Sequence, residues 1–438
     1  MPLPLFSLML CVFSVGSAEL VIAGILPAIA QDLSVSLPSA GLLVTAYALG
    51  VVIAGPLVTL TTSRVPRKPL LLGLMALFVL SNVLAATAVG YPVLMVARVL
   101  SAITHCTLFA VCIVVAGSLA PVGKEASAVS KVAVGLNLAT VLGVPLGVLA
   151  EQHFGWRSTF WCVALISLLA TLLVGLFLPA EAVPVKGGAA DELRVLGNRR
   201  VQLAVVITTL AMAGVFTAYT FVTPILTDLG GFAPSTVTWL LLLFGGGSLL
   251  GNLIGGRLAD RALMPALVGL LAVLGATLAA IALGARLPWL LVVLLFAFGM
   301  AYFAVMPGLQ ARILTTAGDG APTLAVSVNI GAFNVGIAFG AWFGGQLLGL
   351  DLGLRVVLTA ASLLSWAAML VAVGELTRDR RAAAALPSSP APSTPEPSSP
   401  LPSSPAPSSS AASSATPSVS PAGPRTGDPA PLTMEQSR

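Results

Sequence analysis

One carboxylate lies deep within a long apolar stretch at the start of the chain. Glu19 follows eighteen residues without a charged side chain, and the next charged residue is Asp32. An ionisable group at the centre of a membrane helix costs about 2.5–3.5 kcal/mol on insertion scales, so it usually faces a cavity or a partner. Loss of water also favours the neutral form of a carboxyl group. Glu19 is therefore a candidate proton carrier, with a hydrogen-bonded structural glutamate as the alternative.

A cation and an imidazole share a second apolar stretch. Arg98 and His105 are seven residues apart, which is two turns of a helix, so both side chains project from one face. Arg98 could be a snorkelling or purely structural cation, and His105 a packed, neutral, hydrogen-bonded imidazole. The other interpretation is that both residues, together with Glu19, take part in proton coupling, with His105 also able to contact a substrate.

The composition excludes most classes of soluble protein. Hydrophobic residues make up 57% of the 438 residues, charged residues make up 8%, and the mean hydropathy is +1.01. Soluble domains are about 25% charged, so this chain cannot cover itself with polar surface and lipid must be its main solvent. The net charge is +5, but the basic residues are scattered and form no patch for nucleic acid.

We expect neither an enzyme nor a metalloprotein. The chain contains no Walker A, HExxH or GxSxG motif. Its four cysteines lie within apolar runs, and its two histidines are too few for a histidine-based metal centre. The sequence therefore predicts no cofactor and no metal site.

Twelve apolar runs are long enough to cross a bilayer, which takes about 20 residues as a helix. The first run lacks the basic flank of a signal peptide, so we expect it to be retained as a span. A longer connection at 179–201 divides the runs six and six. The predicted fold is all-α and integral to the membrane, with spans at 5–30, 39–60, 69–89, 92–119, 130–150, 158–178, 202–226, 236–256, 263–284, 287–312, 321–347 and 353–375.

Four regions follow from this division. Residues 1–178 and 202–381 are each expected to form a bundle of six helices, with a cytoplasmic loop at 179–201 between them. Residues 382–438 consist mainly of Ala, Pro and Ser. This composition cannot bury enough apolar surface to offset the entropy of ordering, so we expect a disordered tail.

Basic residues are distributed unequally between the two ends of the predicted spans. With the N-terminus in the cytoplasm, three basic residues (Arg157, Arg286 and Arg355) face the outside and fifteen face the cytoplasm. Cytoplasmic loops of membrane proteins carry the excess of Lys and Arg, so we expect both termini inside. The fifteen residues are Arg64, Arg67, Lys68, Lys124, Lys131, Lys186, Arg194, Arg199, Arg200, Arg257, Arg261, Arg312, Arg378, Arg380 and Arg381.

The two halves of the chain align with a constant offset of 197 residues. The offset pairs Pro27 with Pro224, Arg64 with Arg261, Asn137 with Asn334, Gly143 with Gly340, and Gly147 with Gly344. Six spans repeated six later keep the same direction through the membrane, so the two repeats are parallel. This architecture predicts a central cavity between the halves, with alternating access as one half rocks against the other.

Four segments resemble motifs of the major facilitator superfamily. Residues 256–261 (GRLADR) resemble its GxLaDR loop, and 143–147 (GVPLG) resemble the Gly/Pro antiporter motif of its fifth helix. Residues 26–33 (LPAIAQDL) and 155–160 (GWRSTF) are similar to segments of its twelve-helix drug:proton antiporters. The resemblance covers about residues 10–375 and is greatest to bacterial exporters of the arabinose-efflux and chloramphenicol-resistance type.

The resemblance implies roles for several of these residues. Such exporters often carry an acidic residue in the first helix, as at Glu19, and Arg98 matches a fourth-helix arginine linked to proton transfer. Glycines spaced four apart permit close helix approach, and Pro145 removes one helix hydrogen bond. The expected gating residues are Arg64, Arg67, Lys68, Gly143, Pro145, Gly147, Gly256, Asp260 and Arg261.

The loop of the first half departs from the family pattern. Ser63 stands where the family has Asp, and Pro66 stands where it has Gly. In the fourth span, residues 102–106 (AITHC) replace a glycine-rich stretch. We therefore expect the ion-pair lock of the cytoplasmic side in the second half, at Asp260 and Arg261.

Polar and aromatic side chains within the spans are candidates for lining the cavity, although some could simply join helices to one another. They are Asn137, Tyr219, Thr220, Thr223, Tyr302, Asn329 and Asn334.

The predicted function is secondary active export of a small, mostly apolar compound, with a chloramphenicol-like drug favoured, in exchange for protons. Sugar or nucleoside efflux by the same mechanism is the alternative. A sensor or channel is disfavoured by the repeat and by Glu19. We expect the partners to be the substrate, protons and the lipid of a bacterial inner (plasma) membrane, and the functional unit to be a monomer.

Overall fold

The computed structural model describes residues 1–62, 65–121, 124–179, 198–317 and 322–385. The gating candidate Arg64 lies outside the described residues. The same holds for most of the predicted loop at 179–201 and for the predicted tail from residue 386 onwards.

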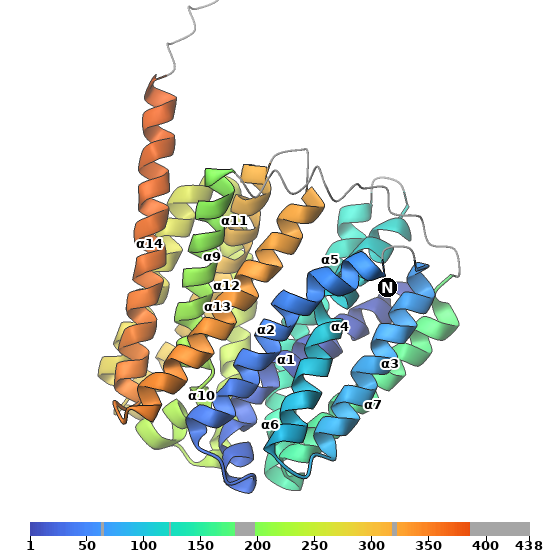
Figure 1. Ribbon diagram of the computed structural model, residues 1–438. Helices are drawn as coiled ribbons and strands as arrows, with labels where there is room; N and C mark the ends of the chain where they lie inside the picture. The colour runs from blue at the N-terminus through green and yellow to red at the C-terminus, as the bar shows by residue number, and fades with distance from the viewer. Residues whose placement is uncertain (63–64, 122–123, 180–197, 318–321, 386–438) are drawn as a thin grey trace, which may run out of the picture. The chain divides into compact units, whose positions relative to one another are not determined.

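The first half of the chain forms helices that match the first six predicted spans (Figure 1). The fifth span runs continuously from α5 through the π-helical turn η1 into α6. The elements are α1 (Leu3–Asp32), α2 (Leu37–Thr61), α3 (Arg67–Ala86), α4 (Tyr91–Ser118), α5 (Glu125–Leu138), η1 (Ala139–Gly143), α6 (Val144–Phe154) and α7 (Trp156–Phe177).

The second half repeats this series of spans. Its elements are α9 (Arg199–Tyr219), α10 (Val222–Pro224), η3 (Ile225–Leu229), α11 (Pro234–Gly284), α12 (Pro288–Ala317), α13 (Pro322–Gly349) and α14 (Leu354–Ala385). The helix α11 covers the eighth and ninth predicted spans because it continues across a kink at Ala262, where φ is −158° and ψ is 85°. A proline ring collides with the carbonyl group four residues earlier in a regular helix, so Pro265 explains the kink.

Ten helices of the described residues are long and apolar enough to cross a membrane. The two arms of α11 count once among them. The helix α13 is not among them, yet it matches the predicted span at 321–347. The prediction of a twelve-span, all-α membrane fold is confirmed.

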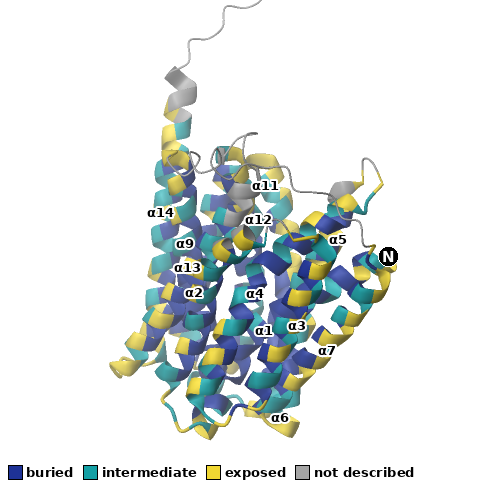
Figure 2. Ribbon diagram, turned by 45° about the vertical axis from the view of Figure 1, so that its right-hand side comes forward, coloured by how far each residue is buried: buried dark blue, intermediate teal, exposed yellow. Residues whose placement is uncertain are grey.

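Exposed residues lie along the outer faces of these helices (Figure 2), and many of them are large and apolar. On α7, for example, Leu165 is 62% exposed and Leu172 is 55% exposed. A large exposed apolar surface indicates contact with a membrane. The chain is therefore a multi-pass membrane protein.

Glycines allow the fifth span of each half to approach the first span of that half. A Cβ atom on Gly143 would collide with Ser17 on α1, and one on Gly340 would collide with the backbone of Ala213 on α9. The offset of 197 residues relates both the glycines and the segments that they contact. The internal repeat of the sequence is thus a repeat of helix packing.

One carboxylate joins two of the segments that resemble family motifs. Asp32, at the end of α1, accepts hydrogen bonds from the indole of Trp156 at 3.0 Å and the guanidinium of Arg157 at 2.6 Å. Arg157 also donates to the carbonyl of Ala88 at 2.9 Å. This cluster fixes the start of α7 against the ends of α1 and α3.

The two halves contact one another mainly away from the basic side, which we define as the side where α3 begins with Arg67 and α9 with Arg199. At the opposite, far side, Thr223 donates to the carbonyl of Gly24 at 2.8 Å, and Gln152 donates to the carbonyl of Pro234 at 2.6 Å. Thr45 on α2 also donates to Ala338 on α13 at 3.3 Å. These bonds close the far side of the interface between the halves.

The glycine packing of α13 generates a prediction for stability. Gly340→Ala should lower the melting temperature by several degrees, because overpacking against a backbone costs about 1–3 kcal/mol. The matched control is Gly331→Ala on the same helix, where a Cβ meets no atom within 4 Å. The melting of both purified variants in detergent, followed by intrinsic fluorescence, provides the comparison. Equal melting temperatures would contradict the packing described here.

Candidate functional site

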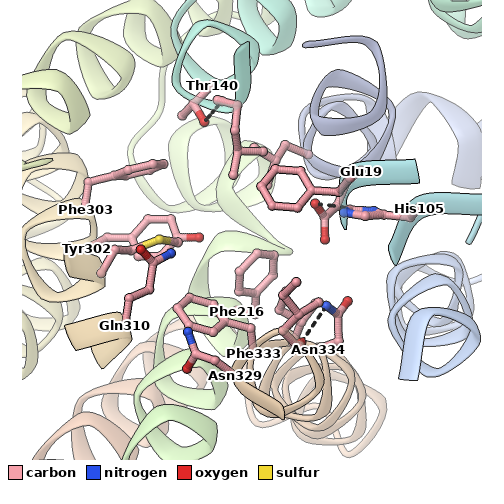
Figure 3. Close-up of a pocket in the computed structure, with 16 residues that line it drawn as sticks. Glu19, His105, Thr140, Phe216, Tyr302, Phe303, Gln310, Asn329, Phe333 and Asn334 are labelled. Atoms are coloured by element: carbon pink, nitrogen blue, oxygen red, sulfur yellow. Dashed lines mark hydrogen bonds and ion pairs between the residues drawn. The ribbon is translucent and has the colours of Figure 1, made fainter. Parts of the chain in front are cut away.

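A cavity of about 120 Å³ lies between the two halves of the bundle (Figure 3). Both halves contribute to its wall, through α1, α4, α5 and η1 on one side and α9, α12 and α13 on the other. The lining residues are Glu19, Leu20, His105, Phe109, Leu136, Thr140, Phe216, Tyr302, Phe303, Met306, Gln310, Asn329, Ile330, Phe333, Asn334 and Ile337.

The cavity wall follows the internal repeat. Five pairs of lining residues are related by the offset of 197 residues: Glu19 with Phe216, His105 with Tyr302, Phe109 with Met306, Leu136 with Phe333, and Thr140 with Ile337. The scaffold of the cavity is therefore nearly symmetric, but its chemistry is not. The acidic and basic side chains of the wall come from the first half, and aromatic side chains occupy the equivalent places in the second half.

The ionisable wall is a short chain of polar contacts. The carboxylate Oε2 of Glu19 lies 4.0 Å from the ring nitrogen Nδ1 of His105. The same nitrogen lies 2.9 Å from the hydroxyl of Tyr47 on α2. Glu19 and His105 are directed toward one another at the cavity edge (Figure 3). The structure thus brings together two of the three predicted coupling residues.

Arg98 lies behind this wall and is only 1% exposed. Its Nη1 donates to the carbonyl of Ala18 at 2.7 Å, directly before Glu19 in the chain. Its guanidinium carbon lies 4.1 Å from the centre of the Tyr47 ring, which is a cation–π contact. The atoms Nε and Nη2 have no hydrogen-bond partner among the described residues. The third predicted coupling residue therefore supports the first two from behind, through α1 and Tyr47.

The aromatic wall is a series of ring contacts in the second half. Phe216 packs edge-on against Tyr219 at 5.6 Å and against Tyr302 at 6.3 Å, measured between ring centres. Tyr302 lies 4.6 Å from Phe303, and Tyr219 lies 5.3 Å from Phe244. Offset and edge-to-face arrangements of this kind stabilise aromatic pairs. They hold an apolar surface opposite the carboxylate.

The predicted cavity residues divide into two groups. Tyr302, Asn329 and Asn334 line the cavity. Asn137, Tyr219, Thr220 and Thr223 do not: Tyr219 packs behind Phe216, Thr220 is buried, and Thr223 joins α10 to α1.

Among the lining and supporting residues that sequence reasoning missed, three show which signals were available. Phe216 is the repeat equivalent of Glu19, so the offset alone could have identified it. Tyr47 is one of four tyrosines and lies within a predicted span, which is the same signal that identified Tyr302. Gln310 was missed because it lies near the end of its predicted span, where polar residues are common.

The gating candidates of the fifth span lie where its helix geometry changes. Gly143 ends η1, and Pro145 lies in the first turn of α6. A Cβ on Gly147 would collide with Val21 on α1, and the Gly147 carbonyl accepts a hydrogen bond from Thr159 at 2.7 Å. This segment is clamped between α1 and α7.

The basic gating candidates of the first half lie at the start of α3. Lys68 donates to the carbonyl of Leu178, after the end of α7, at 2.6 Å. Arg67 is half-buried beside it. Lys68 therefore ties α3 to α7 within one half in this conformation.

The gating candidates of the second half lie on α11 just before the kink. Asp260 and Arg261 are exposed and Gly256 is half-buried, and the part of the chain that the structure describes contains no ion pair of Asp260 or Arg261. A nearby cluster on the basic side was not predicted. Arg312 lies 2.9 Å from the carboxylate of Glu375 and 3.1 Å from that of Asp379. Glu375 was placed at the end of the last predicted span, whereas α14 continues to Ala385.

A family model and several known proteins match this chain over most of its length. The family model described as Major Facilitator Superfamily matches residues 8–318 and 205–416. The inner membrane transport protein YdhP of Escherichia coli (strain K12) is 38% identical over 368 residues, which cover 84% of this chain and 94% of that protein. A chloramphenicol resistance protein of Streptomyces lividans is 37% identical over 380 residues, covering 85% and 96%.

A solved structure has the same fold. It is the crystal structure of a bacterial homolog of the human lysosomal transporter Spinster, in an inward-facing and occupied conformation. The TM-score is 0.69 at 18% sequence identity, over 84% of this chain and 95% of that chain.

The cavity boundary can be tested by cysteine labelling. In a background without Cys11, Cys106, Cys112 and Cys162, Phe333→Cys should react with a small methanethiosulfonate reagent roughly tenfold faster than Tyr219→Cys, because thiol modification requires access to the sulfur. Phe333 lines the cavity, whereas Tyr219 is 1% exposed behind the wall. Comparable labelling rates at the two positions would show that Phe333 and Tyr219 do not differ in their access to the cavity.

Proposed function

Because the chain belongs to the major facilitator superfamily of secondary transporters, we propose that it exports a small, mostly apolar compound, with a chloramphenicol-like drug favoured, in exchange for protons by alternating access. The observation that carries this proposal is the asymmetry of the cavity wall. Glu19 and His105 form one wall, and Phe216 and Tyr302 occupy the equivalent positions of the other.

A shared cavity explains how protons and substrate exchange. The carboxyl of Glu19 is neutral when protonated, and the cavity wall then carries no carboxylate charge. When the proton leaves, the carboxylate needs a hydrogen-bond donor or a cation, and a bound compound with a hydroxyl or amide group supplies a donor. The aromatic side chains bury the apolar part of the same compound. Proton and substrate therefore stabilise different states of one site.

The orientation of the cavity fits the loading step of an exporter. The positive-inside rule places the basic side, and both termini, in the cytoplasm. Cavity residues such as Phe109 and Gln310 lie on the portions of α4 and α12 that lead to this side. The hydrogen bonds between the halves lie on the far side. This arrangement suits uptake of substrate from the cytoplasm or the inner leaflet of a bacterial inner membrane.

The driving force is sufficient for export. One elementary charge moving down 100 mV gains about 2.3 kcal/mol. About 1.4 kcal/mol corresponds to a tenfold change in an equilibrium. One inward-moving proton could therefore sustain a gradient of about 50-fold for a neutral compound, before any contribution from a pH gradient.

The second candidate is export of a sugar or nucleoside. Three amide side chains, Gln310, Asn329 and Asn334, line the second half of the cavity, and such groups suit a polyhydroxylated substrate. The aromatic wall and the similarity to the Streptomyces protein favour the drug. Everted vesicles with an imposed proton gradient discriminate the two: chloramphenicol accumulation that excess sugar or nucleoside does not inhibit supports the first, and the converse supports the second.

Glu19→Gln should abolish proton-coupled export while leaving insertion and folding intact, because the amide has the shape of the carboxyl group but cannot release a proton. Substrate-induced proton release from the purified protein is the measurement. Glu151→Gln, at a half-buried carboxylate of α6 outside the cavity, is the control and should retain release. Undiminished release from Glu19→Gln would rule out Glu19 as the carrier.

Asp260→Asn should destabilise the state in which the cytoplasmic side is closed. Asp260 is exposed and forms no ion pair with any residue that the structure describes, as expected of a group that pairs only after the halves close on this side. Labelling of Phe333→Cys from the cytoplasm should become about two- to fivefold faster, the effect of losing one surface ion pair. Asp351→Asn, in the connection before α14, is the control. Unchanged labelling with normal transport would show that the charges of residues 256–261 set the orientation of the chain in the membrane and do not lock the closed state.

A further inference from the structure

Tyr47 connects the three expected coupling residues, although no motif of the sequence identifies it. Its side chain is 1% exposed, its hydroxyl lies 2.9 Å from Nδ1 of His105, and the Arg98 guanidinium lies over its ring at 4.1 Å. Glu19 lies 4.0 Å from the same Nδ1. Nδ1 of His105 therefore lies near two oxygen atoms, the Tyr47 hydroxyl and the Glu19 carboxylate, and each favours a different protonation state of this nitrogen.

The proton inventory of these groups makes their contacts mutually exclusive. A neutral imidazole has one donor nitrogen and one acceptor nitrogen, whereas a protonated imidazole has two donors. The Tyr47 hydroxyl can donate to Nδ1 only when that nitrogen carries no proton. A carboxylate at Glu19 can accept from Nδ1 only when it does. Tyr47 and Glu19 thus stabilise opposite protonation states of one atom.

The surroundings favour Tyr47 as the donor. Among the described residues, the Tyr47 hydroxyl makes no other hydrogen bond, so reversing its direction would leave a buried O–H without an acceptor. The Arg98 cation over the ring draws electron density from it, which strengthens the hydroxyl as a donor. The other titratable groups around His105 are Glu19 on α1 and Cys106 on α4, with Tyr302 on the opposite cavity wall.

We propose that Tyr47 is a positioning residue of proton coupling, which holds His105 in the neutral form with the proton on Nε2 and so sets the pH at which the Glu19–His105 pair takes up a proton. This inference rests on the proposed function. Arg98 contributes by holding the Tyr47 ring through the cation–π contact and α1 through the hydrogen bond to Ala18. Glu19 then responds to bound substrate. The protonation of His105 is set by Tyr47, which the substrate does not contact.

Tyr47→Phe tests the proposal through a pH profile. Removal of the hydroxyl withdraws a hydrogen bond from the neutral imidazole only, so protonation becomes easier. The pH midpoint for binding of chloramphenicol, the probe, should rise by about one unit, with the affinity at high pH unchanged. Tyr91→Phe is the matched control, because this tyrosine also joins α4 to α2, through the carbonyl of Ser39, but lies outside the cavity.

Three outcomes would overturn the proposal: an unchanged midpoint in Tyr47→Phe, an equal shift in Tyr91→Phe, or a loss of affinity at every pH without a shift. In a His105→Gln background, Tyr47→Phe should cause no further shift. A shift that persists there would show that Tyr47 acts on another group.

A second measurement needs no variant of Tyr47. The chain has two histidines, so ¹⁵N-histidine NMR of the His153→Gln protein reports on His105 alone. The proposal requires the Nε2–H tautomer above the midpoint, and the Nδ1–H tautomer would overturn it. Because the tautomer is measured without substrate, failure of chloramphenicol to bind or to drive proton release would count against the proposed function alone.

Discussion

A charge buried among apolar helices must be compensated by nearby polar atoms, and Arg98 imposes this requirement on the first half of the protein. The guanidinium donates a hydrogen bond to one carbonyl on α1 and makes a cation–π contact with one aromatic ring on α2. These two contacts bind three helices around a cation that makes no ion pair within the described part of the chain. The carbonyl belongs to Ala18, so the same contact fixes the backbone that carries Glu19. The position of Glu19, the proposed proton carrier, thus depends on how one buried charge is compensated.

The two halves share their helix packing but differ in the side chains that line the cavity. Glycines at equivalent positions let α5, η1 and α6 pack on α1, and α13 pack on α9, and this packing gives both halves the same shape. The cavity inherits that symmetry in the placement of its lining residues. The wall differs between the halves at two equivalent pairs: Glu19 against Phe216, and His105 against Tyr302. In the proposed function, the first half titrates while the second presents an aromatic surface.

Much of the fold was predictable because lipid allows few solutions. A helix must satisfy its own backbone in the membrane, so most apolar runs became helices within a few residues of their expected bounds, although α14 continues to Ala385, well beyond the predicted end at 375. The lone carboxylate of the first span, Glu19, was also identified from the sequence, and it lines the cavity. The sequence could not distinguish Tyr302, which lines the cavity, from Tyr219, which packs behind it, because both lie on interior faces and differ only in their neighbours. Tyr47 and the Arg312–Glu375 pair were missed for the same reason: each is defined by a partner on a distant helix.

The present conformation also constrains how the halves can move. To open the far side, the protein must break the hydrogen bonds of Thr223 with Gly24 and of Gln152 with Pro234, each worth about 1 kcal/mol net. Closing the basic side must offset this loss, and Asp260 and Arg261, which are exposed and form no ion pair within the described ranges, are available there for new contacts. A proton or a substrate that binds one state better by a few kcal/mol is then enough to select it. Under the proposed function, a site as small as the Glu19–His105 pair can therefore control the movement of a whole bundle.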